Sequence, residues 1–398
     1  MEEWKEYKLG DVCTELSDGL HKAPKFKIGG DYIFVNAKNI VNGFIVDNDP
    51  TKKSTHEEYL KYASPLNDTT VLYSIDGTIG NVALYRGEKC ILGKGACYMN
   101  PKPSVLDRMF LYYELHSPRF KSYIDRMSTG STIKHISLKT MRGYSFTCPP
   151  IGIQKQIASV LKSLDDKIEV NRRINDNLEQ QAQALFKSWF VDFEPFRDQP
   201  FVESELGMIP QGWKVGTLFE VAEIYDKLRK PLSGKERETM ERIYPYYGAT
   251  SCMDYVDNYI FDGIYTLIGE DGSVTKEDGL PYMQYVWGKF WVNNHAHILQ
   301  GKNGFSTGMI HALLSMTNIQ HLVTGAVQAK LSQANMQKIL LAIPPLNVLS
   351  EIRPAIDSLY SMRRERENES HRLATLRDTL LPRLMSGELK VNEIENMI

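Results

Sequence analysis

The chain has 398 residues, 42% of them hydrophobic and 24% charged, and its formal net charge at pH 7 is −2. This length predicts two to four domains, and the near-neutral balance excludes a chain with a long basic tail for nucleic acid. The five cysteines form no CxxC pair, which favours reduced thiols over a disulfide or zinc framework. Neither a signal peptide nor a run of about 18 apolar residues is visible, so we expect a cytoplasmic protein without a membrane span.

Residues 1–148 form the first predicted globule. Short β-rich runs, such as residues 32–35 and 71–73, are separated by glycine, asparagine and aspartate, which is typical of a mixed α/β domain with many loops. This segment holds 20 Lys and Arg against 17 Asp and Glu. Any affinity for nucleic acid must therefore come from local patches or be shared with a partner protein.

A long helix is predicted over residues 149–192, after Pro149 and Pro150. Positions spaced alternately four and three apart carry an apolar stripe at both ends of the segment, typical of a coiled-coil seam. The packing residues predicted on it are Ile157, Leu161, Leu164, Leu178, Leu185 and Trp189. Such a helix, about 40 residues long, would extend ~60 Å and needs a partner to cover its stripe. Asn171 and Asn175 interrupt the stripe, either as a buried pair that sets the register or as solvated positions where two helices splay.

After a linker at residues 193–212 the chain repeats itself. Gly130 and Gly325, Ser137 and Ser332, and the two Pro-Pro pairs are each 195 positions apart. Residues 213–343 form the second α/β globule, with 12 Lys and Arg against 13 Asp and Glu. Residues 344–392 form the second helix and residues 393–398 a tail. The second helix carries the matching packing residues Ile352, Ile356, Leu359, Leu373, Leu380 and Leu384, and we expect the two helices to be each other's partners.

The sequence offers no convincing catalytic site. The two Pro-Pro pairs are followed by Ile151 and Leu346, whereas adenine methyltransferases carry Asn/Asp-Pro-Pro-Tyr/Phe, and no GxxxxGK[ST] loop is present. His295 and His297 have a spacing that could serve a metal, a hydrogen-bonding role inside the domain, or a DNA contact. Of these alternatives the structural role is favoured, and no metal is assigned.

Several clusters carry the groups that suit base readout, namely Lys and Arg for guanine and Asn and Gln for adenine. Each cluster is also explained by an ordinary solvated face, and most protein–DNA contacts reach phosphate rather than bases. The candidates in the first globule are Lys22, Lys25, Lys27, Asn36, Lys38, Asn39, Thr132, Lys134 and His135. Those in the second globule are Arg229, Lys230, Tyr247, Thr250, Lys276, Gln328 and Lys330.

The order of these segments resembles the specificity subunit of type I restriction-modification enzymes over nearly the whole chain. The similar motifs in the first half are DGLHKAPK at 18–25, VNAKNI at 35–40 and GTIG at 77–80. Those in the second half are YYGAT at 246–250, GEDG at 269–272 and NNHAH at 293–297. The helices resemble the spacers of this family, ending in LFKSWF at 185–190 and LLPRLMSGEL at 380–389.

The resemblance implies an α+β protein in which two target recognition domains are separated by two long helices packed as an antiparallel coiled coil. It implies a non-catalytic subunit that reads a bipartite, asymmetric site in double-stranded DNA and binds two modification (methyltransferase) subunits and the restriction (translocase-nuclease) subunits. The S-adenosylmethionine, ATP and magnesium of such an enzyme belong to the partners, so no cofactor is expected in this chain. The alternatives are a specificity subunit of another restriction class, a methyltransferase or nuclease in its own right, and a protein-only scaffold.

Overall fold

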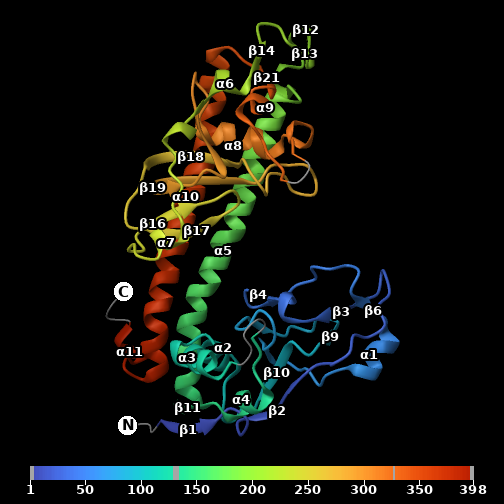
Figure 1. Cartoon of the computed structure of the whole chain (residues 1–398), viewed down its shortest axis with the longest axis vertical. Helices are drawn as coiled ribbons and strands as arrows, with labels where there is room; N and C mark the ends of the chain where they lie inside the picture. The colour runs from blue at the N-terminus through green and yellow to red at the C-terminus, as the bar shows by residue number, and fades with distance from the viewer. Residues whose placement is uncertain (1–3, 129–133, 326–327, 395–398) are drawn as a thin grey trace. The chain divides into compact units, whose positions relative to one another are not determined.

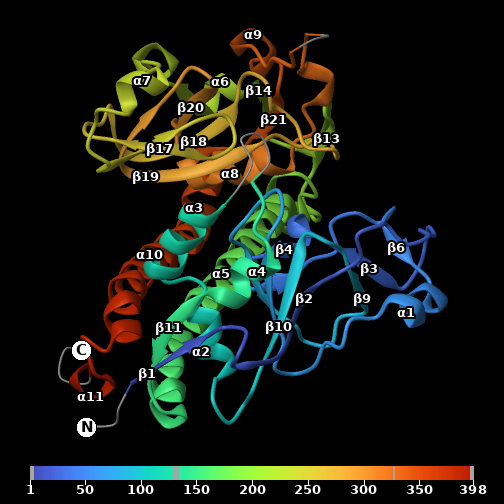
Figure 2. The same ribbon diagram turned by 60° about the horizontal axis from the view of Figure 1, so that its bottom comes forward.

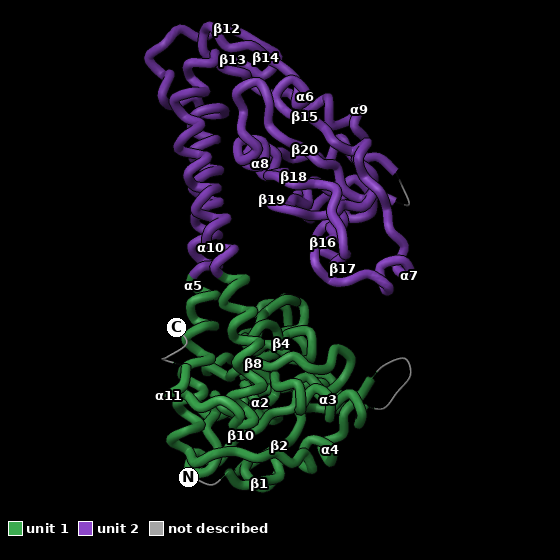
Figure 3. The backbone as a smooth tube through the Cα atoms, turned by 90° about the vertical axis from the view of Figure 1, so that its left-hand side faces the viewer, with its two compact units in different colours: residues 1–170, 370–398 green, residues 171–369 purple. Residues whose placement is uncertain are grey.

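A computed structural model describes residues 4–128, 134–325 and 328–394, which form two compact units. Unit 1 comprises residues 1–170 and 370–398 and unit 2 comprises residues 171–369, shown in green and purple in Figure 3. Each unit holds one half of each long helix, α5 (Ile151–Phe190) and α10 (Leu346–Ser386). The helix α10 ends before the expected residue 392 because Gly387 adopts a left-handed conformation with φ of 77°.

Unit 1 is built on two small sheets. An antiparallel sheet has the order β2 (Cys13–Asp18), β10 (Ala96–Pro101), β7 (Val71–Ser74), β8 (Val82–Leu84). A second sheet has the order β6 (Lys53–Ser54), β3 (Tyr32–Val35), β9 (Cys90–Leu92), with β3 and β9 parallel. Two further pairs are β4 (Ile40–Val41) with β5 (Phe44–Ile45), and β1 (Lys5–Lys8) with β11 (Ser145–Cys148). The runs predicted at 32–35 and 71–73 are β3 and β7.

Short helices complete unit 1. They are η1 (Ala37–Asn39), α1 (His56–Tyr62), α2 (Arg108–Glu114), α3 (Pro118–Met127), α4 (Leu138–Gly143) and α11 (Val391–Ile394). In Figure 1, α2 and α3 lie beside the first half of α5. Phe110 and Phe120 from these two helices share one apolar core with Leu161 of α5 and Leu384 of α10. The stripe of the long helices is therefore covered by the globule as well as by the partner helix.

Unit 2 contains one six-stranded sheet. Its order is β15 (Ala222–Ile224), β20 (Ala296–Gly301), β18 (Phe261–Gly269), β19 (Met283–Val292), β16 (Tyr244–Tyr247), β17 (Cys252–Val256). The helix α8 (Thr307–Met316) packs on β18, β19 and β20 (Figure 2). Two strand pairs lie outside this sheet, β12 (Phe201–Ser204) with β13 (Gly207–Pro210), and β14 (Lys214–Thr217) with β21 (Leu340–Ile343). The remaining helices are η2 (Glu194–Phe196), α6 (Leu218–Val221), η3 (Asp226–Leu228), α7 (Gly234–Arg237), η4 (Gln320–Leu322) and α9 (Gln333–Met336).

The predicted duplication is confirmed at the level of elements. The strands β11 and β21, the helices α4 and α9, and the first residues of α5 and α10 each lie 195 positions apart. Ser137 and Ser332 cap α4 and α9 by accepting hydrogen bonds from the N–H groups of Thr140 and Asn335. The β1–β11 pair of unit 1 corresponds to the β14–β21 pair of unit 2.

The long helices run antiparallel in unit 2. In unit 2, Asn171 donates to Glu369 over 2.9 Å and Asn175 to Glu367 over 3.1 Å, so rising numbers on α5 face falling numbers on α10. Asn171 is 0% and Asn175 6% exposed, which agrees with a buried register pair rather than with splayed, solvated helices. Ile157, Leu161, Leu178, Ile352, Ile356, Leu380 and Leu384 are buried. Leu164, Leu185, Trp189 and Leu359 pack against the cores, and Leu373 is half-buried.

Candidate nucleic-acid interface

Two loops of unit 1 are held side by side by backbone hydrogen bonds. Residues 75–77, which follow β7, pair with residues 134–136, which precede α4. The N–H of Ile136 donates to the carbonyl of Ile75 over 2.9 Å, and the N–H of Gly77 donates to the carbonyl of Lys134 over 3.3 Å. Gly77 has a φ of 73°, a backbone conformation that favours glycine. We call these six residues the paired-loop cluster of unit 1.

Unit 2 repeats this cluster at positions 195 higher, with residues 270–272 paired to residues 329–331. The N–H of Leu331 donates to the carbonyl of Glu270 over 2.9 Å, and the N–H of Gly272 donates to the carbonyl of Ala329 over 3.0 Å. Gly272 has a φ of 81°. The two Asp-Gly pairs, at 76–77 and 271–272, thus each lie on one side of a duplicated loop arrangement.

A third loop brings a basic group to each cluster. In unit 1 the ammonium group of Lys94 lies 3.8 Å from the carboxylate of Asp76, and in unit 2 the Nδ1 atom of His295 lies 3.8 Å from the carboxylate of Asp271. The side chains of Lys94 and His295 are 45% and 46% exposed. Each cluster therefore presents an acidic and a basic side chain to solvent at matched places.

Five of the nine predicted residues of the first globule gather around the cluster of unit 1. Lys134 and His135 are part of it. The N–H of Lys94 donates to the carbonyl of Leu20 over 2.8 Å, which places the segment of Lys22 beside the third loop. Asn36 and Lys38 flank Ala37, whose carbonyl accepts a hydrogen bond from the side chain of Asn81 over 3.5 Å, four residues after the cluster residue Gly77. Asn36 and Lys38 also line a hollow of about 240 Å³.

The other four predicted residues of the first globule do not belong to this group. Asn39 is buried and holds its own turn, since its side chain accepts from the N–H of Asn36 and donates to the carbonyl of Val46. Lys25 and Lys27 are exposed beside β6, where the N–H of Lys27 donates to the carbonyl of Lys53. Thr132 lies outside the described residues.

In unit 2 the cluster gathers Lys330 and the neighbouring Gln328, both exposed. Thr250 lies on an exposed turn whose backbone passes against Gly269, immediately before the cluster. Lys276 lies farther along the loop that follows the cluster, where its N–H donates to the carbonyl of Leu280.

Tyr247, Lys230 and Arg229 are placed by other contacts. The ring of Tyr247 packs edge-on against Phe290, and burial raises the pKa of its hydroxyl to about 12. Lys230 is exposed, and its carbonyl accepts from the indole N–H of Trp291. Arg229 has a side chain only 13% exposed, and its guanidinium group is turned into the protein.

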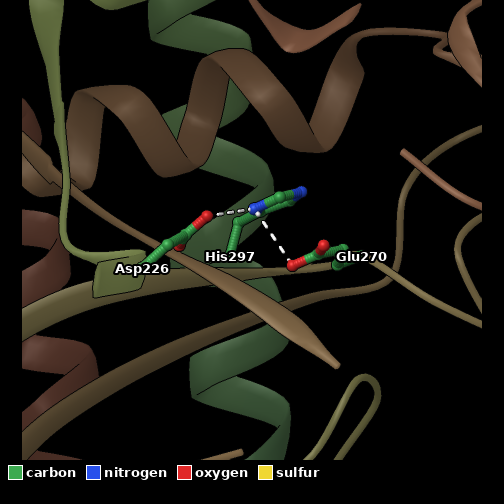
Figure 4. Close-up of side chains that lie close together, drawn as sticks. All are labelled: Asp226, Glu270 and His297. Atoms are coloured by element: carbon green, nitrogen blue, oxygen red, sulfur yellow. Dashed lines mark hydrogen bonds and ion pairs between the residues drawn. The ribbon is translucent and has the colours of Figure 1, made fainter. Parts of the chain in front are cut away.

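Arg229 belongs to a buried network of four ionisable side chains. Its Nη1 atom lies 2.5 Å from Glu270 Oε2, and its Nη2 atom lies 3.5 Å from Asp226 Oδ2. His297, 1% exposed, places Nδ1 2.5 Å from Asp226 and 3.5 Å from Glu270, as Figure 4 shows. Burial acts to raise the pKa of Asp226, but hydrogen bonds from His297 and from the N–H of Ile298, together with the charge of Arg229, hold that pKa below its ordinary value.

Asp226, Glu270 and His297 also have the composition of a metal site, with one ligand atom each within 4.8 Å of one another. The guanidinium group of Arg229 already contacts both carboxylates, however, and a metal ion would have to displace it from both of them. The arrangement is better explained as an ion-pair network. His297 has the hydrogen-bonding role that we favoured for this motif, whereas His295 is half-exposed and faces Asp271.

Sequence reasoning missed Lys94 and Glu270. Lys94 stands between Gly93 and Gly95, and this glycine-flanked lysine between two strands was an available signal. Glu270 stands one residue before the Asp-Gly pair, but nothing in the sequence indicates that its carboxylate is turned toward Arg229. The network becomes visible only once β18, β20 and η3 are placed together.

The comparisons with known proteins agree on one family. The profile of the type I restriction modification DNA specificity domain matches residues 1–180 and 210–370. The type I restriction enzyme MjaIX specificity subunit of Methanocaldococcus jannaschii is 26% identical over 418 residues, covering 98% of this chain and 95% of that protein. The HindI specificity subunit of Haemophilus influenzae is 29% identical over 210 residues, covering 50% of this chain and 43% of that protein.

A solved structure shows the same fold. The S subunit of the type I restriction-modification system from M. genitalium superposes with a TM-score of 0.54 at 19% identity, over 96% of both chains. The profile match covers most of the chain and falls on both halves of the duplication. The chain therefore belongs to the family of type I restriction-modification specificity subunits, the non-catalytic subunits that recognise the DNA sequence.

Proposed function

We propose that the two paired-loop clusters are the parts of this subunit that contact DNA. The observation that carries the proposal is that one backbone arrangement occurs twice, and each copy holds an exposed cation on the same loop, Lys134 in unit 1 and Lys330 in unit 2. Exposed cations beside backbone N–H groups suit phosphate contacts, and neighbouring amides such as Asn36 and Gln328 suit base edges.

The duplication also supports a bipartite target. We assign residues 1–148 and 213–343 to the two target recognition domains, residues 149–192 and 344–392 to the spacer helices, and residues 193–212 and 393–398 to the linker and tail. The two clusters differ in side chains, with His135 in the first where Lys330 stands in the second. Two similar readers with different contact groups should read two different half-sites, so the target is asymmetric.

The proposed complex includes partners. Two modification subunits would bind the long helices, and restriction subunits would join the complete enzyme; S-adenosylmethionine, ATP and magnesium would be bound by those partners. Among the described residues, no helix is both long enough and apolar enough to cross a membrane. We place the working complex in the cytoplasm, where its DNA substrate is found.

Methylation mapping tests the assignment of the clusters. The chain is expressed with its modification subunits, and the methylated sites are read in the host genome for Lys134→Gln and for Lys330→Gln. We expect Lys134→Gln to weaken or relax methylation at one half of the site, and Lys330→Gln at the other half, by roughly 5- to 100-fold for a lost base contact. A lost phosphate contact would lower methylation without changing either half.

The matched control is Lys61→Gln, which removes an exposed lysine of α1 that pairs with Glu57 over 2.8 Å. We expect this variant to methylate the same sites as the parent chain. Unchanged methylation in both cluster variants would refute the placement of the DNA contacts, and a single variant that relaxed both halves would refute the one-cluster, one-half-site assignment.

A further inference from the structure

The second cluster is supported by buried charges, and the first is not. At the position of Glu270, unit 1 has Ile75, which is 1% exposed, and at the position of Leu331 it has Ile136, which is 0% exposed. The same backbone pairing therefore forms over an apolar support in unit 1. Since buried ion pairs are seldom more stabilising than apolar packing, the charges of unit 2 are not needed to form the loops. The buried charges of unit 2 therefore have a role other than forming the loops.

The network holds the segment that follows Lys330 at two points. The Nε2 atom of His297 lies 2.6 Å from the carbonyl of Leu331, which can only accept, so Nε2 carries the proton. The Nδ1 atom faces Asp226, which also accepts from the side chain of Gln333 over 2.7 Å. Residues 331 and 333 are thus tied to His297 and Asp226, which are themselves hydrogen-bonded to each other, and these contacts restrict the loop.

Glu270 connects this network with the surface. Its Oε2 atom meets the guanidinium group of Arg229, and its Oε1 atom lies 3.5 Å from the ammonium group of Lys330. The side chain of Glu270 is 13% exposed, whereas that of Lys330 is 53% exposed. One carboxylate therefore joins a buried cation to a solvent-facing one, and so restricts where the lysine can point.

We propose that Glu270 and His297 are positioning residues for the second reading unit, which act on DNA specificity by fixing the loop and the side chain of Lys330. This inference rests on the proposed function, because it takes Lys330 as a group that contacts DNA. Removing the carboxylate frees the lysine to reach phosphates and several bases. Selectivity at one half-site then falls while overall DNA binding is retained.

The test uses the complete complex with its modification subunits and reads methylation at both halves of the target. Glu270→Gln removes the charge at nearly constant shape. Glu270→Asp keeps a negative charge for Arg229 but shortens the reach toward Lys330. We expect both variants to relax the second half-site by roughly 5- to 100-fold while the first stays unchanged. Because Glu270 acts through Lys330, we expect Glu270→Gln combined with Lys330→Gln to relax it no further than Lys330→Gln alone.

A matched control is Glu223→Gln, which removes an exposed carboxylate of β15 that pairs with Lys302 over 3.3 Å. Thermal unfolding of each variant separates misfolding from lost selectivity, and if Glu270→Gln does not fold, Glu270→Asp decides. The inference is overturned if Lys330→Gln relaxes the second half-site while a folded Glu270 variant leaves it intact. If Lys330→Gln itself changes nothing, the DNA contact proposed for Lys330 fails, and the positioning role fails with it.

Discussion

Gln154 gives the sharpest test of how the first half of α5 is joined to its globule. This side chain is 1% exposed, and its amide accepts from the N–H of Asp107 and donates to the carbonyls of Val105 and Pro149, each over 2.8 Å. Asp107 is in turn the N-cap of α2. In unit 2 the equivalent position is Leu349, also buried, so the hydrogen bonds are particular to unit 1.

We expect Gln154→Ala to destabilise unit 1 by about 2–4 kcal/mol. The change leaves one N–H and two carbonyl groups without their partner. Each such group costs about 1–3 kcal/mol when it is fully buried. Because Val105 and Asp107 are only half-buried, the lower part of that range applies. For a unit of this size the shift is roughly 4–16 °C in Tm. Gln154→Leu, which copies unit 2, restores the volume but not the hydrogen bonds. We expect its stability to lie between that of the parent chain and that of Gln154→Ala.

Thermal unfolding and hydrogen exchange across α2 measure this effect. Gln156→Ala is the control, because it removes an exposed glutamine two positions farther along the same helix, and we expect it to stay within about 0.5 kcal/mol of the parent chain. Equal melting of Gln154→Ala and Gln156→Ala would refute the reasoning. A Gln154→Leu variant as stable as the parent would show that the three hydrogen bonds add nothing beyond packing.

Two further predictions concern the helix pair in unit 2. The Oδ1 atom of Asn171 is buried and has no hydrogen-bond partner among the described residues, so we expect Asn171→Leu to stabilise unit 2 by about 1 kcal/mol in thermal unfolding; a lower Tm would contradict this. The imidazole of the buried His311, with Nε2 3.6 Å from the carboxylate, and the charge of Arg363 lower the pKa of Glu179 from 4.5 to about 2 despite burial. Because the pKa of Glu179 is lower in the folded state, this stabilisation is present above pH 4.5 and is lost as the pH falls toward 2. Between these pH values, Glu179→Gln should reduce the slope of the unfolding free energy against pH by at most about 1.4 kcal/mol per pH unit. An unchanged slope would refute it.

The architecture was largely predictable because it depends on periodicity and repetition. The stripe that begins at Ile157 and its copy at Ile352 indicate two long helices, and the common offset of 195 positions indicates equivalent elements in both halves. Gly77 and Gly272 share this offset, and both adopt the left-handed conformation that glycine accepts. Each of these signals is local or repeated in the sequence, and none requires knowledge of side-chain contacts.

The site was only partly predictable, because the same residue type serves opposite purposes depending on burial. Asn39 and Lys38 are neighbours in one predicted cluster, but Asn39 is buried in its own turn while Lys38 is exposed. Arg229 carries the same charge as Lys330, yet its guanidinium group is buried against two carboxylates. These differences arise from contacts between residues far apart in the chain, which composition and spacing do not encode.

The matched backbone pairing of the two clusters has an evolutionary consequence. Because main-chain hydrogen bonds define the loops, almost any side chain can occupy the outward positions without loss of the fold, as the exchange of His135 for Lys330 between the halves illustrates. After duplication, one copy could diverge while the other kept its original preference. On the proposed assignment of the DNA contacts, a few replacements at these surface positions would change the DNA target without a new scaffold.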